Sequence, residues 1–265
     1  MVNIDNLSVH SFDIIGDIAI LQIPKGMEKK SKKMALEIIK KNKNVKTVYA
    51  RGKFRGRLRK HDVKFIYGIN KAETIYKESS CLMKLNVKTC YFSPRLSHDR
   101  LDIAKQVKNH ENILVMFSGI APYGLVLGKK SKAKKIYCVE LSKEATKYAL
   151  DNVKLNKIKN IEVIQGDVKR ICPKFKQKNV LFDRIIMARP QLKDSFLKEA
   201  FIVAKKNSII HFYDFLFTDE IEEGYKKIEN EAKKSKKKYK ILGIKKIRDI
   251  GPRKYHLRFD IKMLN

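Results

Sequence analysis

The chain of 265 residues is long enough for one large domain or for a domain with a smaller second unit, and either arrangement buries an adequate hydrophobic core. Its 43% of hydrophobic residues indicates a globular protein, and the absence of a long apolar run in the sequence excludes a helical membrane protein. The 60 basic and 28 acidic residues leave a net charge of +32, which favours a polyanionic partner such as nucleic acid, with a lysine bias of the source organism as the alternative explanation.

The N-terminal residues 1–13 carry neither a basic region nor an apolar segment of the kind that directs secretion, so we expect a cytoplasmic location. Residues 7–24 predict two strands around a turn at Gly16, and residues 27–41 predict an amphipathic helix. Short strand-like runs follow at residues 45–50, 63–67, 73–76 and 82–85. Together these elements predict a small N-terminal α+β domain over residues 1–90.

An arginine-rich segment, RGKFRGRLRK at residues 51–60, separates the first two of these runs. Clustered guanidinium groups on a flexible loop suit a phosphate backbone or the edge of a base, because each group can donate two parallel hydrogen bonds. A solvated loop without a ligand is the alternative. The segment therefore predicts that the N-terminal domain contacts a nucleic acid.

The remainder of the chain, residues 91–265, predicts an alternation of strands and helices. Ser93 and Pro94 predict the N-cap and first residue of a helix that reaches about residue 108. Strands are expected at residues 113–117, 136–139, 161–165, 181–187 and 208–215, and helices at residues 122–130, 143–154, 193–205 and 219–235. Residues 239–247 and 255–263 predict an antiparallel pair. A parallel core closed by such a pair predicts an α/β, Rossmann-like sheet of the seven-stranded methyltransferase type.

The first strand–helix–strand unit of this domain, residues 113–140, predicts a ligand site. Its first strand enters a turn of small residues around Gly119, and its second strand ends in Glu140. Small residues let the backbone approach a ligand, and an acid at the end of the second strand suits the two hydroxyls of a ribose. A purely structural turn is the alternative, because the turn has fewer glycines than a dinucleotide fingerprint.

Ordered motifs along the chain carry a more specific signal. They are YFSPRLSHDR at residues 91–100, MFSGIAPY at 116–123, VELSKEA at 139–145, GDV at 166–168, IIMARP at 185–190 and GPRKYHLRFDI at 251–261. In this order they resemble the archaeal and eukaryotic tRNA (guanine-37 N1)-methyltransferases and their wyosine-pathway relatives. The resemblance covers nearly the whole chain. It implies a class I methyltransferase domain, S-adenosylmethionine as cofactor, the anticodon loop of a tRNA as partner and a monomeric enzyme.

The resemblance also implies which residues bind the cofactor. Glu140 would accept from the ribose hydroxyls, Asp167 would reach the adenine amino group, and Tyr91 would support the pocket or stack on a flipped base. The turn would pass under the methionine part of the cofactor. The full set of implied cofactor residues is Tyr91, Phe117, Ser118, Gly119, Ile120, Ala121, Pro122, Glu140, Leu141, Asp167 and Val168.

The chemistry of the methylation predicts two protein groups, a base for the N1 proton and a cationic donor for O6. N1 of guanine carries a proton at neutral pH, so a carboxylate that accepts this proton would accelerate the attack on the methyl group. An arginine would stabilise the charge that develops on O6. The resemblance places Asp99 at the position of the family's acid, with a first-turn helix acid as the alternative role. The O6 arginine is best matched by Arg59, with Arg55 and Arg57 as rivals, and Arg95 and Arg100 are implied contacts to phosphate or loop.

The chain departs from the family pattern at three places, of which one is Ala121, where many members have a second glycine in the turn. Val115 replaces the acid that many members have before the M-F pair, and Ala188-Arg189-Pro190 replaces an N-L-P motif whose asparagine reads the guanine. We place Pro190 in the catalytic set and Ala188 and Arg189 in the substrate set. The loss of the asparagine predicts either relaxed recognition that also admits a tricyclic wyosine intermediate, or a shifted reaction. N1 methylation is the primary prediction, and C7 methylation of 4-demethylwyosine is a possible second activity.

Two other functions stay open at the level of sequence. A wyosine-pathway aminocarboxypropyltransferase is disfavoured, because those relatives lose the P-R pair and the acid that SPRLSHDR keeps. A tRNA-binding protein without catalysis is suggested by Val115 and Ala188. His211 and His256 lie in strand-like runs and are expected to be structural. The four cysteines form no C-x-x-C pair, so we expect neither a metal site nor disulfides.

Overall fold

The computed structural model describes residues 11–55, 60–188 and 194–265, without the side chains of residues 53–55, 60 and 61. The chain divides into two compact units. The first comprises Met1–Glu78 and Leu82–Pro94, and the second comprises Ser79–Cys81 and Arg95–Asn265. We propose that these units act as the two domains that the sequence predicts on either side of residue 90.

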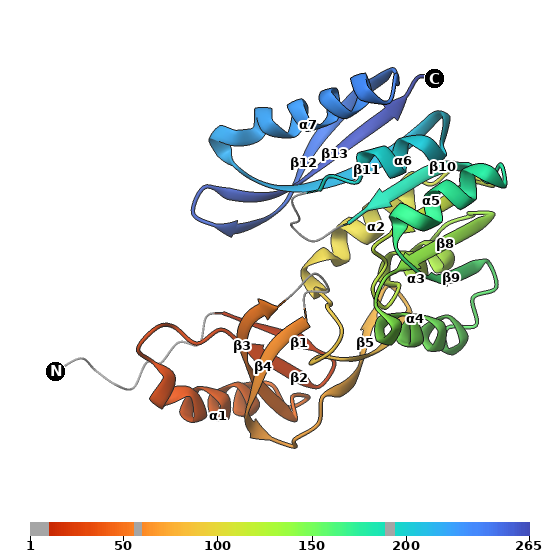
Figure 1. Cartoon of the computed structure of the whole chain (residues 1–265). Coiled ribbons are helices and arrows are strands. Elements are labelled where there is room, and N and C mark those ends of the chain that lie inside the picture. The colour runs from red at the N-terminus through yellow and green to blue at the C-terminus, as the bar shows by residue number, and fades with distance from the viewer. Residues whose placement is uncertain (1–10, 56–59, 189–193) are drawn as a thin grey trace. The chain divides into compact units, whose positions relative to one another are not determined.

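A four-stranded sheet in the order β1-β2-β3-β4 forms the centre of the first unit (Figure 1). Its strands are β1 (Phe12–Ile15), β2 (Ile18–Leu21), β3 (Thr47–Arg55) and β4 (Lys60–Gly68). Strands β2 and β3 run parallel, and the other neighbours run antiparallel. A short two-stranded sheet of β5 (Glu73–Glu78) and β6 (Cys81–Asn86) follows. The predicted α+β character of this region is confirmed.

One helix, α1 (Ser31–Lys41), joins the parallel strands β2 and β3 after a 3-10 turn at Glu28–Lys30. Met34, Ala35 and Ile38 recur at helical spacing on α1 and are buried. They form a small hydrophobic core with Ala19, Leu21, Val45 and Val48. The many lysines of α1 stay on its solvated face, as the amphipathic pattern predicts.

The arginine-rich segment differs from its prediction as a loop. Strand β3 continues through Arg55 and β4 begins at Lys60, and the two strands pair as far as these residues. Pairing continues because it satisfies the backbone N–H and C=O groups, while long charged side chains can remain in solvent. Residues 56–59, which include two of the predicted RNA-contacting arginines, lie outside the described residues.

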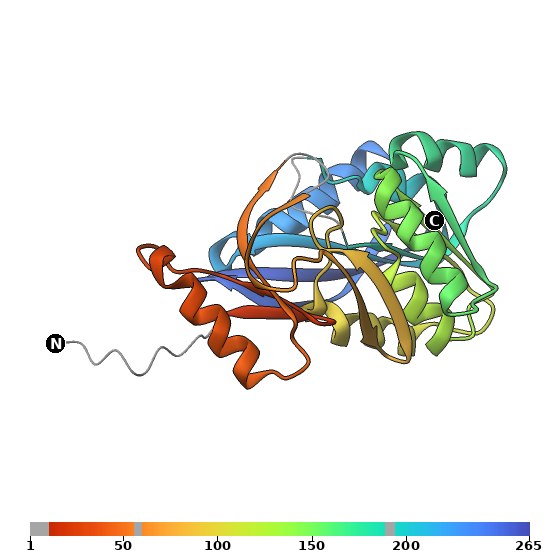
Figure 2. The same ribbon diagram turned by 90° about the horizontal axis from the view of Figure 1, so that it is seen from below.

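A seven-stranded sheet in the order β12-β13-β11-β10-β7-β8-β9 forms the second unit (Figure 1 and Figure 2). The strands β7 (Asn112–Met116), β8 (Lys135–Glu140), β9 (Ile161–Gln165), β10 (Phe182–Met187) and β11 (Ala204–Phe217) run parallel. Strand β13 (Lys254–Met263) runs antiparallel to β11 and to β12 (Tyr239–Gly251). The predicted methyltransferase sheet with an antiparallel pair is confirmed, and β13 lies inside the sheet.

The two faces of this sheet differ in chemistry, because side chains alternate along each strand. Ile210 and Phe212 of β11 belong to a hydrophobic core with α5 (Val168–Gln177), α6 (Leu197–Val203) and α7 (Ile221–Lys234). His211 and Tyr213 point to the opposite face, where they meet polar groups. That face carries α2 (Ser97–Gln106) and α3 (Pro122–Lys130), while α4 (Lys143–Leu155) packs against β8 and β9.

Two predicted helices need correction, and one helix was not predicted. A 3-10 turn at Pro94–Leu96 precedes α2, so Ser93 is not the N-cap of the α-helix. Helix α5 was not predicted, because Pro173 in its interior removes a backbone donor and resembles a stop signal. Helix α6 ends at Val203, since Ala204 already pairs with Phe182 of β10. Among the described residues, no helix combines the length and the apolar character needed to cross a membrane.

Gly124 allows the close packing of α3 on β8, because a Cβ at this position would collide with Sγ of Cys138. We predict that Gly124→Ala lowers the free energy of unfolding by about 1–3 kcal/mol, since overpacking outweighs the better helix propensity of alanine. Urea unfolding followed by circular dichroism measures the change. Gly251→Ala, whose Cβ would meet nothing within 4 Å, is the control and should change stability by less than about 0.5 kcal/mol. Equal losses in both variants would contradict the packing argument.

Candidate active site

The turn between β7 and α3 has an unusual backbone. Phe117, Gly119 and Ala121 have positive φ angles of 59°, 56° and 66°, a conformation that glycine alone adopts without cost. The N–H of Ala121 donates to the carbonyl of Ser118 at 2.9 Å, and Pro122 then begins α3. Two strained non-glycine residues in one turn are more often found at functional sites than elsewhere.

One carboxylate holds this turn in place. Glu140 is the last residue of β8, and its Oε2 accepts the N–H of Gly119 at 2.7 Å while its Oε1 accepts the N–H of Ser142 at 2.8 Å. Burial raises the pKa of the Glu140 carboxyl, although N–H groups of Ser142, Gly119 and Leu141 oppose this shift. Each oxygen retains a second lone pair. Glu140 can therefore accept from two further hydroxyls without releasing the turn.

The other predicted cofactor residues of the second unit lie at the same edge. Asp167 is the N-cap of α5, and its Oδ1 accepts the N–H of Lys169 at 3.0 Å. Because β7, β8 and β9 are parallel neighbours, the turn, Glu140 and Asp167 all follow the carboxyl ends of adjacent strands. Leu141 and Val168 directly follow the two acids. The structure brings these residues together, while their contacts with a cofactor remain a prediction.

Ser118 in the turn has an unsatisfied hydroxyl. Its side chain is 4% exposed, and its Oγ has no hydrogen-bond partner within the part of the chain that the structure describes. Leaving a buried hydroxyl unpaired costs about 1–3 kcal/mol. The side chain of the preceding residue, Phe117, packs against Phe196, with the two ring centres 5.0 Å apart. The turn thus has a backbone that a ligand can approach closely, and it has a polar atom, Ser118 Oγ, with which the ligand could form a hydrogen bond.

Asp99, the predicted base, is the centre of a buried polar cluster. Its side chain is 3% exposed, and its Oδ2 accepts the hydroxyls of Tyr123, at 2.7 Å, and Tyr213. Its Oδ1 accepts from Nη1 of Arg258 at 2.5 Å. Burial and the negative charge of Asp99 raise the pKa of both tyrosines well above the usual value, so both hydroxyls remain donors.

The cluster continues along the face of the sheet through Arg258. Its guanidinium also binds both carboxylate oxygens of Asp260, at 2.8 and 2.9 Å, and Oδ2 of Asp102 at 3.0 Å. Asp260 in turn lies 2.6 Å from Nδ1 of His211, and Nη1 of Arg184 lies 2.8 Å from Nε2 of the same ring. Burial lowers the pKa of His211 although Asp260 opposes the shift, so the imidazole is neutral at pH 7. The prediction of a structural role for His211 agrees with these contacts.

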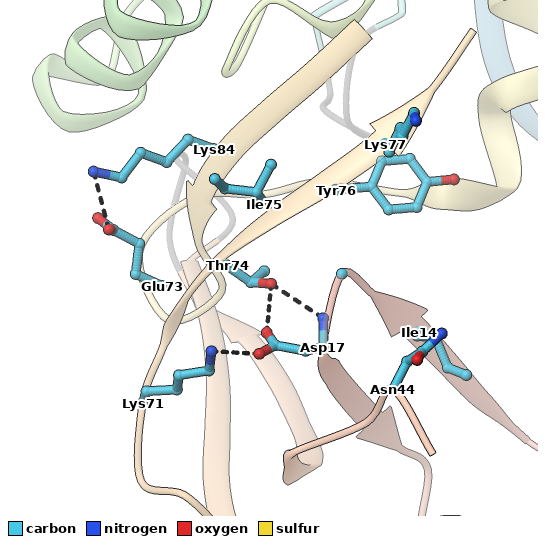
Figure 3. A pocket seen from close by; sticks show the side chains of 11 residues that line it. Ile14, Asp17, Asn44, Lys71, Glu73, Thr74, Ile75, Tyr76, Lys77 and Lys84 are labelled. Carbon is cyan, nitrogen blue, oxygen red and sulfur yellow. Dashed lines mark hydrogen bonds and ion pairs between the residues drawn. The ribbon is translucent and has the colours of Figure 1, made fainter. Parts of the chain in front are cut away.

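A separate hollow of about 650 Å³ lies within the first unit (Figure 3). Four of the charged side chains that line it form pairs, Lys71 with Asp17 and Lys84 with Glu73 at 3.0 Å. The Thr74 hydroxyl donates to Oδ1 of Asp17 at 2.7 Å and accepts the N–H of Asp17 at 3.2 Å. These bonds fix the β1–β2 turn to β5. None of the predicted site residues lines this hollow, and its contacts are accounted for by folding of the unit.

Comparison with known families matches most of the chain. The model of the TRM5/TYW2 methyltransferase domain matches residues 74–242, and the model of the TYW2 N-terminal domain matches residues 3–71. The chain belongs to the TRM5/TYW2 methyltransferase family. The resemblance inferred from the ordered motifs is therefore confirmed.

Named relatives within the TRM5/TYW2 family are similar over nearly the whole chain. The tRNA (guanine(37)-N(1))-methyltransferase Trm5b of Pyrococcus abyssi is 35% identical over 96% of this chain and 74% of that protein, and its crystal structure superposes with a TM-score of 0.86 over 97% of this chain and 76% of that one. The tRNA (guanine(37)-N(1))/4-demethylwyosine(37)-methyltransferase Taw22 of Nanoarchaeum equitans is 34% identical over 96% of this chain and 100% of that protein. Methanocaldococcus jannaschii Trm5 in complex with adenosine is 28% identical, with a TM-score of 0.79 over 96% and 74% of the two chains.

The residues that the family resemblance assigns to the substrate differ in their surroundings. Ala188 is half-buried directly after β10, at the same sheet edge as Glu140, and Arg95 is exposed. Arg100 is 1% exposed, with its guanidinium carbon 5.8 Å from the ring centre of Tyr123, so its burial argues against the predicted RNA contact. Tyr91 belongs to the first unit and is half-buried. Arg57, Arg59, Arg189, Pro190 and the side chain of Arg55 lie outside the described residues.

Sequence reasoning missed three residues of the Asp99 cluster in this TRM5/TYW2 family member. Tyr123 and Arg258 stand within motifs that were recognised, MFSGIAPY and GPRKYHLRFDI, but no role was assigned to either. Tyr213 and Arg258 face each other in the β11–β13 register. The available signal was an arginine and a tyrosine within the apolar parts of two strands, since polar groups that are buried in a sheet need partners.

We predict that Arg258→Met destabilises the protein by about 3–5 kcal/mol, because Asp99 and Asp260 would keep buried charges without their shared counter-ion. Urea unfolding measures the loss. Lys245→Met is the control, since Lys245 reaches Asp102 from the surface with its side chain 48% exposed, and exposed pairs contribute less than about 1 kcal/mol. A loss for Arg258→Met no larger than that of the control would disprove the role of Arg258 as the centre of the cluster.

Proposed function

We propose that this protein transfers a methyl group from S-adenosylmethionine to N1 of the guanosine that follows the anticodon of a tRNA, and that it also methylates C7 of 4-demethylwyosine. The observation that carries the proposal is the sheet edge at which the 117–121 turn, Glu140 and Asp167 converge. Family membership supports the reaction class, and two named relatives act on position 37 of tRNA.

The residues at this edge fit the cofactor. Glu140 keeps two lone pairs for the ribose hydroxyls, and Asp167 follows β9, the strand next to β8, where we place the adenine. Ser118 Oγ, buried and without a partner among the described residues, is available to the amino or carboxylate group of the methionine part. The relative that binds adenosine supports an adenosine site in this fold. When bound, S-adenosylmethionine supplies the methyl group on its sulfonium.

The geometry of Asp99 limits how it could act as the base. Its Oδ2 accepts two tyrosine hydroxyls, whereas Oδ1 accepts one bond from Arg258, so Oδ1 retains the lone pair that could receive the N1 proton. Strand β10 ends at Met187, and Met187 pairs with Phe212 of β11. Tyr213, the next residue of β11, therefore lies level with the carboxyl end of β10. The cluster therefore reaches the edge at which Ala188 begins the predicted base-reading segment. Arg59 remains the proposed donor to O6.

A second candidate is transfer of the aminocarboxypropyl group of the same cofactor. The match of residues 3–71 to the TYW2 N-terminal domain favours it, as does a relative named tRNA(Phe) (4-demethylwyosine(37)-C(7)) aminocarboxypropyltransferase, which is 30% identical. Against it stands SPRLSHDR, in which Pro94, Arg95 and Asp99 keep the pattern of the methyltransferases. Which group leaves the sulfonium depends on which carbon faces the acceptor, and this is decided by the geometry of the bound complex.

The proposal also states which part of the tRNA is bound and where. We place the anticodon loop at the carboxyl edge of the sheet, with the arginine-rich segment of residues 51–60 contacting the target base or its phosphates. The net charge of +32 supports a polyanionic substrate. We further propose a monomer in the cytoplasm, which light scattering of the purified protein and fractionation of cells would test.

The reaction is tested by incubating the protein with labelled S-adenosylmethionine and an unmodified tRNA transcript, followed by nucleoside mass spectrometry. We predict 1-methylguanosine at position 37. A parallel incubation with tRNA that carries 4-demethylwyosine should yield the C7-methylated tricycle. An aminocarboxypropyl adduct in either reaction would replace the primary proposal with the second candidate, and no product with retained cofactor binding would favour a protein that binds tRNA without catalysis.

Cofactor affinity should depend on pH through Glu140. Because burial raises the pKa of this carboxyl above the ordinary 4.5, protonation removes an acceptor from the ribose at a higher pH than for an exposed glutamate. We predict that the affinity for S-adenosylmethionine is constant from about pH 8 downward, and then falls before the ordinary glutamate range is reached. Calorimetry at successive pH values measures it. Glu140→Gln should bind more weakly and with no such fall, and an unchanged pH profile in this variant would rule out Glu140 as the titrating group.

A further inference from the structure

A polar pocket of about 1040 Å³ lies at the other edge of the seven-stranded sheet, where β7, β10 and β11 begin. Its wall includes the segment after α2, the first residues of β10 and β11, and part of β12. None of the residues predicted to bind cofactor or RNA lines it. The pocket is therefore separate from the carboxyl-edge site within this unit.

The acids of this pocket already have partners. Asp183 accepts from Nζ of Lys205 with both oxygens, at 2.8 and 2.9 Å, and Glu111 accepts from Nε and Nη2 of Arg184 at 2.7 and 3.0 Å. Asp260 accepts from Arg258. Each carboxylate on the wall is thus neutralised by a group of the protein itself.

Three lysines of the wall have no such partner. Lys108, Lys206 and Lys262 line the pocket, and no acid of the described chain pairs with their ammonium groups. Lys108 and Lys206 are exposed and Lys262 is half-buried. Over all the residues that line it, five basic and three acidic, the pocket carries an excess of two positive charges.

Ser208 supplies an independent observation. It is 3% exposed and lines the pocket, and its Oγ has no hydrogen-bond partner in the described residues. A hydroxyl in this state is a donor for a ligand that enters the pocket. Leu242, 52% exposed, and Gly243, whose added Cβ would meet nothing within 4 Å, leave the rim open.

We infer that this pocket binds a phosphate group, held by the ammonium groups of Lys108, Lys206 and Lys262 and by the Ser208 hydroxyl. Lysine binds phosphate as a point charge, and phosphate oxygens accept from hydroxyl donors. The phosphate could belong to the tRNA backbone outside the anticodon loop or to a free nucleotide, and the two sources are separated by experiment. The inference goes beyond the proposed methyl transfer and does not depend on which group is transferred.

The test compares the wild type with Lys206→Gln/Lys262→Gln and with Ser208→Ala. Lys147→Gln/Lys154→Gln is the matched control, because these two exposed lysines of α4 do not line the pocket and remove the same charge. Calorimetry with inorganic pyrophosphate measures the small-anion arm. Filter binding of a tRNA transcript over a range of salt concentrations measures the RNA arm.

For a free phosphate ligand, we expect pyrophosphate to bind the wild type and the control equally, and each pocket variant about tenfold or more weakly. For a tRNA phosphate, the slope of log affinity against log salt should fall by about 0.7–0.9 for each lysine removed from the pocket and stay unchanged in the control. Either pattern supports the inference. It is overturned if neither arm responds, or if the control loses as much as the pocket variant.

Stability separates a binding role of Ser208 from a structural one. Removing a buried hydroxyl that has no partner does not weaken the fold, so the thermal midpoint of Ser208→Ala should be equal to or above that of the wild type. The same variant should lose anion or tRNA affinity. A lower midpoint with unchanged affinity would show that Ser208 serves the fold, and would remove the inference.

Discussion

A single guanidinium, that of Arg258, joins three carboxylates that come from two different elements. Asp99 and Asp102 lie on α2, and Asp260 lies on β13 beside Arg258 itself. Buried at 2% exposure, this cation stabilises α2 on the sheet by charge where apolar contact would otherwise be expected. Burial tends to lower the pKa of the guanidinium, but its hydrogen bonds to Asp260 and the charge of Asp99 raise it above the usual value. The position of the predicted base Asp99 thus depends on a residue far away in the sequence.

The two edges of the seven-stranded sheet present different chemical groups to a ligand. At the carboxyl edge, Glu140 binds two N–H groups and so defines the shape of a turn that can approach a ligand closely. At the amino edge, three lysines that have no acidic partner within the described part of the chain surround an open pocket. The first arrangement suits a neutral sugar with hydroxyl donors, and the second suits an anion. Between them, the face that carries α2 holds an unbroken sequence of polar contacts from Asp99 to Glu111.

The sequence predicted the sheet well, because each of its parallel strands is a short apolar run followed by a turn or helix signal. It also placed the turn, Glu140 and Asp167 on one edge, since parallel neighbours end on the same side. The prediction of elements from the sequence was wrong where tertiary contacts outweighed a local signal. Helix α5 was missed because Pro173 in its interior resembles a stop signal. The arginine-rich composition of residues 51–60 led to the prediction of a loop, whereas β3 extends to Arg55 and β4 begins at Lys60. The partners of Asp99 were not predictable by spacing, because Tyr123, Tyr213 and Arg258 are separated from it by 24, 114 and 159 positions.

The place of β13 in the sheet has a consequence for the order in which the protein can assemble. This strand comes last in the described chain, yet it lies between β11 and β12 and supplies Arg258. Until Arg258 has emerged from the ribosome, Asp99 lacks its counter-ion, and β12 lacks the strand with which it pairs. The parallel strands β7 to β10 can pair before this, but the ion pairs that join α2 to β13 form only when residues 254–263 arrive. The predicted catalytic acid therefore gains its buried ion pair only after β13 has joined the sheet.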